Sequence, residues 1–177
     1  KQYKHILVDE FQDVNSLQIE LLNLLLSPDA GLFCVGDDWQ SIYGFRGSNV
    51  DYIINFNDYF NDALISKLNK NYRSTENIVE ASNEVIRHNK YKIDKVIKAS
   101  KKSANKVTIY AAASEEDGVE FFIEQIKSLY RKGYMYENIA VLYRRSRMFD
   151  PYRKMLNKKN LSVQAKTIHA AKGMEVN

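Results

Sequence analysis

Short apolar runs alternate with longer amphipathic segments along most of the chain. The apolar runs, which we predict to be short strands, occupy residues 6–8, 32–36, 63–68, 106–112, 138–144 and 163–167. The amphipathic segments, which we predict to be helices, occupy residues 16–27, 50–60, 74–90, 114–133 and 149–160. Strands that alternate with helices predict an α/β fold with mostly parallel sheets.

The predicted helix at 114–133 has the clearest boundaries. Ser114 and Asp117 form a capping-box pattern at its start, and Gly133 is a typical residue for its end. Ser74 is the predicted N-cap of the helix at 74–90, and Pro151 is predicted in the first turn of the helix at 149–160. In the helix at 16–27, leucines recur at helical spacing at Leu17, Leu21, Leu24 and Leu25.

The composition is that of an ordinary globular protein. With 177 residues, of which 45% are hydrophobic, the chain is long enough for one good core or two small ones. No apolar stretch approaches the roughly 20 residues of a membrane span, and the first residues lack the pattern of a signal peptide. We therefore expect a cytoplasmic protein with no membrane partner.

The net charge and the numbers of cysteine and histidine exclude some classes of protein but do not identify the function. A net charge of +4 is compatible with a nucleic-acid partner but does not establish one. Cys34 is the single cysteine, which excludes a disulfide scaffold and favours a buried, inert thiol, and the three histidines lack the spacing of zinc ligands. The lysine-rich connector at 92–106 is interpreted as a solvated loop, with a phosphate-contacting surface as the alternative.

Acids and a glutamine, in the sequence DEFQD, follow the first predicted strand. Acids just past a strand lie at the rim of a sheet, where α/β proteins place chemistry. In ATP-driven enzymes the first acid of such a pair holds Mg²⁺, and the second takes a proton from the water that attacks the γ-phosphate. The pattern predicts Asp9 as the metal ligand and Glu10 as the base, with Gln12 and Asp13 bracing the loop. A strand that simply exits into an acidic loop gives the same pattern.

The loop after the second predicted strand, with the sequence VGDDWQSIYGFRGS, brings several more functional side chains close together in sequence. The amide of Gln40 can contact a γ-phosphate or its attacking water, and Arg46 can neutralise phosphate charge. Tyr43 and Phe45 offer flat faces on which unpaired bases stack. The structural alternative is that the aromatic residues cover the core and the glycines supply turn geometry.

Four stretches of the chain resemble, in order, motifs II, III, IV and V of the superfamily 1 DNA helicases of the UvrD/Rep group. They are VDEFQD, VGDDWQSIYGFRGS, LNKNYRST and TIHAAKGME. The resemblance implies P-loop NTPase (RecA-like) motor domains with mostly parallel sheets, one partial and one largely complete. Residues 1–66 would be the C-terminal half of the first motor domain, and residues 67–177 the second, truncated before motif VI.

The resemblance also implies a role for each matched residue. Asp9 and Glu10 match the Walker B acids, and Gln40 matches the glutamine that senses the γ-phosphate. Phe45 matches the aromatic residue that stacks on a base, and Tyr43 its neighbour. The remaining matches are Arg46 near the γ-phosphate, Tyr72 on adenine, Arg73 as an arginine finger, Thr167 and His169 on DNA, and Glu175 near the ATP ribose.

Departures from the family pattern define what we expect of this chain on its own. No G-x-x-x-x-G-K-[ST] sequence is present, and the chain ends before the arginine of motif VI, so we expect an inactive fragment of a helicase. Only about 20 residues lie between Arg144 and Thr167. The spacing leaves no room for the large accessory insertion of UvrD and Rep, and it resembles the compact form found in helicase IV.

The leading hypothesis is an ATP- and Mg²⁺-dependent 3′ to 5′ helicase or translocase that acts on single-stranded and duplex DNA. Repair or recombination proteins are the expected partner class. One alternative is a helicase-derived nucleic-acid-binding module without catalysis. Another is a metal-dependent nuclease or phosphatase that uses a cluster of carboxylates at Asp9, Glu10, Asp13, Asp37 and Asp38.

Overall fold

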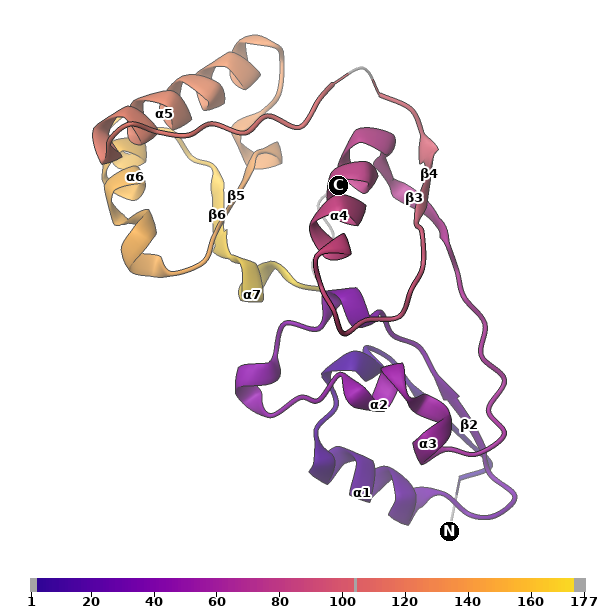
Figure 1. Ribbon diagram of the computed structural model, residues 1–177. Coiled ribbons are helices and arrows are strands. Elements are labelled where there is room, and N and C mark those ends of the chain that lie inside the picture. The colour runs from indigo at the N-terminus through magenta and orange to yellow at the C-terminus, as the bar shows by residue number, and fades with distance from the viewer. Residues whose placement is uncertain (1–2, 104, 174–177) are drawn as a thin grey trace. The chain divides into compact units, whose positions relative to one another are not determined.

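The computed structural model describes residues 3–103 and 105–173 (Figure 1). The chain forms two compact units, Lys1–Thr108 and Ile109–Asn177. Within the described residues the sheets are three parallel pairs of strands, β1 with β2, β3 with β4 and β5 with β6. The predicted α/β class with parallel pairing is therefore confirmed, in sheets smaller than the alternation of elements predicted.

The first pair of strands in the first unit follows the predicted pattern closely. β1 (His5–Val8) pairs with β2 (Gly31–Cys34), and α1 (Ser16–Leu25) forms the crossover between them (Figure 1). Asn15 caps α1 in a capping box, because its side chain accepts from the Gln18 N–H while the Gln18 side chain accepts from the Asn15 N–H.

The core beside this sheet is built on Phe11, Ile19 and Leu22. Phe11 is fully buried, and its ring meets the ring of Phe56 edge-on at 5.3 Å. The leucines singled out by their helical spacing in α1 do not belong to this core, and each is at least about one third exposed: Leu17, Leu21, Leu24 and Leu25. Cys34 packs against this core, and burial raises the pKa of its thiol to about 12, which keeps it protonated.

The predicted helix at 50–60 is broken into α2 (Asp51–Ile54) and α3 (Phe56–Tyr59). Asn55 separates them, with φ −107° and ψ 42°, values that lie outside the helical region. Asn55 also donates a side-chain hydrogen bond to Asp51, so the break is held by local polar contacts.

The predicted strand at 63–68 was wrong. The third strand is β3 (Lys70–Thr75), which pairs with β4 (Lys98–Lys101), and α4 (Glu76–Arg87) connects them. A strand needs a neighbouring backbone, and none pairs with 63–68 in the described residues, so Leu64 and Leu68 are almost fully exposed. Helix α4 begins after Thr75 rather than at Ser74, because Thr75 still pairs with β4.

The second unit contains the best-predicted helix. α5 (Glu115–Arg131) starts at Ser114, whose hydroxyl accepts from the Asp117 N–H at 3.1 Å, and ends before Gly133, which has a φ of +93°. β5 (Ala140–Tyr143) and β6 (Gln164–Thr167) form its sheet, with α6 (Ser146–Lys158) between them and α7 (Ile168–Ala171) after them. Its core residues are Val119, Ile123, Ile126, Ile139, Phe149 and Leu156.

Two further predictions, for residues 106–112 and for Pro151, were wrong. Residues 106–112 form no strand; instead the ring of Tyr110 stacks on Phe121 at 3.7 Å and its hydroxyl donates to Asp117. Pro151 lies in the interior of α6, since that helix begins at Ser146, earlier than predicted. No helix among the described residues combines the length and the apolar character that crossing a bilayer requires.

Candidate functional site

The loop after β1 places the predicted Asp–Glu pair at the carboxyl end of the strand. Glu10 has a φ of 50° and a ψ of 40°, the left-handed region that non-glycine residues seldom adopt. Its N–H donates to Asp9 Oδ1 at 2.8 Å, while the next residue, Phe11, is buried in the core and donates its N–H to the Val35 carbonyl. A strained backbone held from both sides fixes the direction in which the Glu10 carboxylate projects.

Gln12 connects this loop to the loop that follows β2. Its side chain is almost completely buried, and Nε2 donates to Glu10 Oε2 at 2.5 Å and to Asp13 Oδ2 at 3.4 Å. Its Oε1 accepts from the backbone N–H of Asp37 at 2.9 Å. The expectation that Gln12 braces the loop is confirmed.

Gly36 is required by the close approach of Gln12. A Cβ at this position would lie 2.6 Å from Gln12 Oε1 and 2.7 Å from the Cδ1 of Ile53, which is closer than real Cβ atoms come. Glycine is needed here because Gln12 and Ile53 pack closely against the backbone, and not because the residue has an unusual φ. Turn geometry was the structural alternative for the glycines of this loop, and for Gly36 the structure gives a packing reason instead.

The first part of the loop after β2 continues the same set of contacts. Gln40 Nε2 donates to Asp37 Oδ2 at 2.8 Å, and Asp37 Oδ1 accepts from the Trp39 N–H at 3.1 Å. Glu10, Gln12, Asp37 and Gln40 thus form one continuous chain of hydrogen bonds, which we call the acid–amide network. It joins the predicted base to the predicted γ-phosphate sensor.

A lysine from a distant part of the first unit completes this region. Lys95 Nζ lies 2.6 Å from Asp37 Oδ1 and 2.7 Å from Asp38 Oδ1, and the side chain of Asp38 is only 1% exposed. Burial raises the pKa of Asp37, but hydrogen bonds from Lys95 and Gln40 and the charge of Lys95 outweigh it, so the pKa lies below its usual value. The interpretation of residues 92–106 as a solvated loop was wrong for Lys95, whose side chain is 11% exposed.

The second part of the same loop is an exposed aromatic turn formed by Tyr43, Phe45 and Arg46. The guanidinium carbon of Arg46 lies 5.2 Å from the ring centroid of Tyr43 and 5.4 Å from that of Phe45. Phe45 is 66% exposed, so it does not cover the core, which was the structural alternative for it. Gly47 follows with a φ of +87°, a conformation that glycine adopts without strain.

Tyr72 and Arg73 lie in β3 of the first unit. The Tyr72 ring is 65% exposed, with Lys70 Nζ 5.0 Å from its centroid. Asn71 Oδ1 accepts from the N–H groups of Arg73 and Ser74 at 2.9 and 2.8 Å, within the part of β3 where the register with β4 shifts. Their predicted roles on adenine and γ-phosphate remain predictions.

The predicted DNA contacts of the second unit lie around α7. Thr167 Oγ1 accepts from the Ala170 N–H at 3.1 Å and so caps that short helix. The ring nitrogens of His169 lie 3.0 and 3.2 Å from Arg144 Nη1, so His169 and Arg144 form one polar surface. Glu175, predicted near the ATP ribose, lies outside the described residues.

The acids of the first unit do not form a closed metal cage. No group of three or more His, Cys, Asp or Glu side chains within the described residues is arranged to hold a metal ion. Mg²⁺ bound with a nucleotide needs only one or two carboxylates, since phosphate oxygens and water complete its shell, and the exposed Asp9 at the end of β1 fits that demand. Asp37 and Asp38, which a metal-dependent nuclease would use, are instead paired with Lys95.

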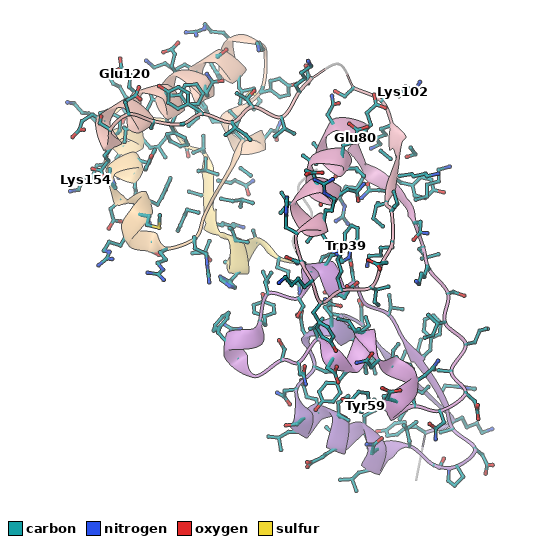
Figure 2. All side chains as sticks on the ribbon, in the orientation of Figure 1. Trp39, Tyr59, Glu80, Lys102, Glu120 and Lys154 are labelled. Atoms are coloured by element: carbon teal, nitrogen blue, oxygen red, sulfur yellow. The ribbon has the colours of Figure 1, made fainter. Side chains whose placement is uncertain are left out.

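Among the partners that hold the predicted residues in place, sequence reasoning found Gln12 but missed Phe11 and Lys95. Phe11 and Gln12 carry a local signal, because they lie inside the DEFQD stretch between predicted site residues. Lys95 carries none, because it is one lysine among several in a connector and its partners are 57 and 58 residues away in sequence. Figure 2 labels Trp39, which lies where the loop after β2 meets the segment that contains Lys95.

Comparisons with known proteins match two parts of the chain to two family models. Residues 1–61 match the family model described as the UvrD/REP helicase N-terminal domain. Residues 66–166 match the model described as the UvrD-like helicase C-terminal domain. The loops after β1 and β2 fall within the first match, and Tyr72, Arg73 and Lys95 fall within the second.

Individual relatives are similar over most of the chain. A probable DNA helicase II homolog from Mycoplasma capricolum is 38% identical over 162 residues, which are 92% of this chain and 22% of that protein. The ATP-dependent DNA helicase PcrA of Leuconostoc citreum is 39% identical over 145 residues, which are 81% of this chain and 19% of that protein. The chain therefore spans about a fifth of the length of these relatives.

Proposed function

Because the chain belongs to the UvrD-like helicase family, we propose that its gene product is a DNA motor that couples ATP hydrolysis to movement along single-stranded DNA and to unwinding. Relatives named as ATP-dependent DNA helicases support the use of ATP and DNA. The 3′ to 5′ polarity, a role in DNA repair and the partner proteins extend this proposal by family resemblance.

The observation that carries the proposal is the acid–amide network. Glu10 and Gln40 come from loops after different strands, and Gln12 and Asp37 connect them through hydrogen bonds of 2.5, 2.9 and 2.8 Å. A hydrolase that acts on a γ-phosphate needs a base and an amide held in a fixed mutual geometry, since positioning supplies much of the rate. A module that only binds nucleic acid has no use for this arrangement.

Each residue then has a defined part in the reaction. The Glu10 carboxylate accepts the proton of the attacking water, and the Gln40 amide orients that water or the γ-phosphate. Asp9 would hold Mg²⁺, which supplies positive charge to the phosphate oxygens when it is bound. Arg73, from the region that matches the C-terminal domain, would add positive charge as ATP draws the two motor domains together.

The aromatic turn is the proposed contact with single-stranded DNA. Phe45 presents an exposed ring on which a base can stack, and Arg46 adds a cation beside it. The resemblance predicts that Arg46 approaches the γ-phosphate, but its contacts with the rings of Tyr43 and Phe45 favour the DNA side. Thr167 and His169 are the proposed DNA contacts of the second unit.

The proposed architecture is a pair of RecA-like motor domains, of which residues 1–66 contribute part of the first and residues 67–177 much of the second. The two family matches, at 1–61 and 66–166, support a change of domain near residue 66. The parallel pairing in each described sheet is compatible with such domains.

The test is ATP hydrolysis by the gene product that contains this sequence, with and without single-stranded DNA. We expect hydrolysis to be stimulated by DNA, and Glu10→Gln to lower kcat by about 100-fold or more, because it removes the base without changing its shape. Glu80→Gln is the matched control, since it makes the same change at an exposed carboxylate on α4 (Figure 2).

Different failures point to different functions. If the gene product binds single-stranded DNA but does not hydrolyse ATP, the interpretation as a non-catalytic binding module replaces the interpretation as a motor. Cleavage of DNA by Mg²⁺ without ATP would support the nuclease interpretation. If Glu10→Gln and Glu80→Gln hydrolyse ATP equally well, Glu10 is not the base of the reaction.

A further inference from the structure

We propose that Lys95 is a positioning residue for ATP hydrolysis, because it holds Asp37 and through Asp37 fixes the amide of Gln40. The inference rests on the proposed function, in which Gln40 acts on the γ-phosphate or its water. It assigns to the lysine-rich connector a role in the active site that its sequence does not indicate.

Lys95 reaches two neighbouring carboxylates at once. Its Nζ lies 2.6 Å from Asp37 Oδ1 and 2.7 Å from Asp38 Oδ1. On the other side of Asp37, Oδ2 accepts from Gln40 Nε2 at 2.8 Å. The carboxylate of Asp37 is therefore held between the ammonium group of Lys95 and the amide of Gln40, so its position depends on both.

The backbone near Lys95 is tied to the same loop. The Ile93 N–H donates to Asp38 Oδ2 at 2.7 Å, and Trp39 Nε1 donates to the Ile93 carbonyl at 3.3 Å. The ammonium group of Lys95 also lies 4.9 Å from the centroid of the Trp39 ring. These contacts make Ile93 to Lys95 a docked segment, which we call the 93–95 clamp.

A second anchor lies just before the clamp. The hydroxyl of Tyr91 donates to Asp51 at the start of α2, and Asn55 Nδ2 donates to the Tyr91 hydroxyl at 3.0 Å. The segment from Tyr91 to Lys95 is thus attached at two places, to α2 and to the loop after β2, before the chain enters β4. It cannot shift away from the loop after β2 without breaking both sets of contacts.

Burial explains why the lysine is required. The side chains of Lys95 and Asp38 are 11% and 1% exposed, so each charge has lost most of its water. A buried charge is tolerated only when an opposite charge and hydrogen bonds replace that water. Loss of Lys95 would leave Asp38 and Asp37 without their cation, and we expect both to turn toward solvent and to release Gln40.

The clamp also crosses the boundary between the two family matches. Asp37 and Asp38 lie in the region that matches the N-terminal domain, and Lys95 lies in the region that matches the C-terminal domain. Any movement of the β3, β4 and α4 region relative to the loop after β2 must therefore break the clamp or move Asp37 with it. Lys95 is thus placed to link the position of one region to the geometry of Gln40 in the other.

The experiment compares variants of the gene product in steady-state ATP hydrolysis with saturating single-stranded DNA. Lys95→Met removes the charge and keeps the length, Lys95→Arg keeps the charge, and Lys102→Met is the control at an exposed lysine of the same connector (Figure 2). We expect Lys95→Met to lower kcat about tenfold with the KM for ATP within about twofold, because positioning and not binding is lost. Lys95→Arg is expected to recover most of kcat.

A double-mutant cycle separates positioning from general stability. If Lys95 acts through Gln40, Lys95→Met causes little further loss of kcat in a Gln40→Ala background. A merely structural role lowers kcat by the same factor in both backgrounds, and that result would overturn the proposal. Lys95→Gln serves in the same cycle if Lys95→Met does not fold, since it keeps a hydrogen-bond donor.

The remaining outcomes are equally decisive. A higher KM for ATP with unchanged kcat would mean that Lys95 contacts the nucleotide directly, which would overturn the positioning role. Equal activity of Lys95→Met and Lys102→Met, while Glu10→Gln is inactive, would refute the clamp and leave the motor intact. An inactive wild type would instead refute the proposed function, and the positioning role with it.

Discussion

The two parts of the loop after β2 differ in almost every physical property, although only a few residues separate them. Asp37, Asp38 and Gln40 are tied into hydrogen bonds and ion pairs, and Asp38 is buried. In the aromatic turn, Phe45 is exposed and Arg46 lies against two rings. One part is fixed from inside the protein, and the other presents an open surface.

The difference fits the two ligands that we propose for this loop, the γ-phosphate and single-stranded DNA. Chemistry on a phosphate requires groups that are already in place, since their reorganisation would add to the barrier. Recognition of single-stranded DNA without sequence preference requires exposed flat surfaces and cations, which tolerate any base. Only a few residues of the loop separate the parts that would meet these two demands.

The strongest way to break the fixed part is Gln12→Leu. The change leaves the partly buried N–H of Asp37 and the carboxylate of Glu10 without the Gln12 amide, so we expect kcat for ATP hydrolysis to fall about 100-fold. DNA affinity without nucleotide should stay within about twofold, because the aromatic turn is untouched. Steady-state hydrolysis and a DNA-binding titration measure the two effects, and an unchanged kcat would show that the network is not needed.

The matching test of the open part is Phe45→Ala. Loss of one stacked base weakens binding of single-stranded DNA by about 1–3 kcal/mol, while hydrolysis without DNA should not change. Fluorescence anisotropy of a labelled oligonucleotide measures the binding. Phe33→Ala is a matched control at another exposed phenylalanine, on β2, and the same loss of affinity there would contradict a specific stacking role.

Arg46→Gln tests whether that arginine contacts single-stranded DNA or the γ-phosphate of ATP. If Arg46 neutralises a phosphate of single-stranded DNA, its removal reduces the slope of log affinity against log salt by about 0.7. The KM for ATP should then remain unchanged. A large rise in the KM for ATP with an unchanged salt slope would instead support a contact between Arg46 and the γ-phosphate.

The smallest expected effect is on acid stability. Because the pKa of Asp37 is lowered in the folded protein, its ionised form stabilises the fold above the unfolded value of about 3.9, and this contribution is lost as pH falls through the lower, folded value. Asp37→Asn lacks that contribution. The difference in unfolding free energy between wild type and variant should therefore shrink below about pH 4, as measured by denaturant unfolding; a constant difference would exclude a role for the charge.

The sequence pattern correctly predicted the strands that have a paired neighbour and the helix whose ends are set by capping residues. β1, β2 and β5 follow apolar runs with a partner strand at hand, and α5 follows its cap at Ser114 and its glycine at Gly133. The runs at 63–68 and 106–112 have similar composition but no paired neighbour in the described residues, and no strand forms there. Strand formation depends on partners that the local pattern does not contain.

The site divides in the same way. Glu10, Gln40 and Phe45 were proposed as site residues because their residue types and order fit the chemistry, and their roles remain predictions. The 93–95 clamp could not be predicted, because a lysine in a basic connector is interpreted as solvated until its distant carboxylate partners are known. A supporting side chain is therefore predictable when it lies within a motif, as Gln12 does, and not when its partners are distant in sequence, as those of Lys95 are.

The most direct test of a two-part loop is ATP hydrolysis by the gene product as a function of single-stranded DNA concentration, in wild type, Gln12→Leu and Phe45→Ala. We expect Gln12→Leu to lower the plateau without moving the half-saturating DNA concentration. We expect Phe45→Ala to raise the half-saturating concentration by about fivefold or more and to leave the plateau near that of wild type. If both variants change the same parameter, the two parts of the loop do not have separate roles.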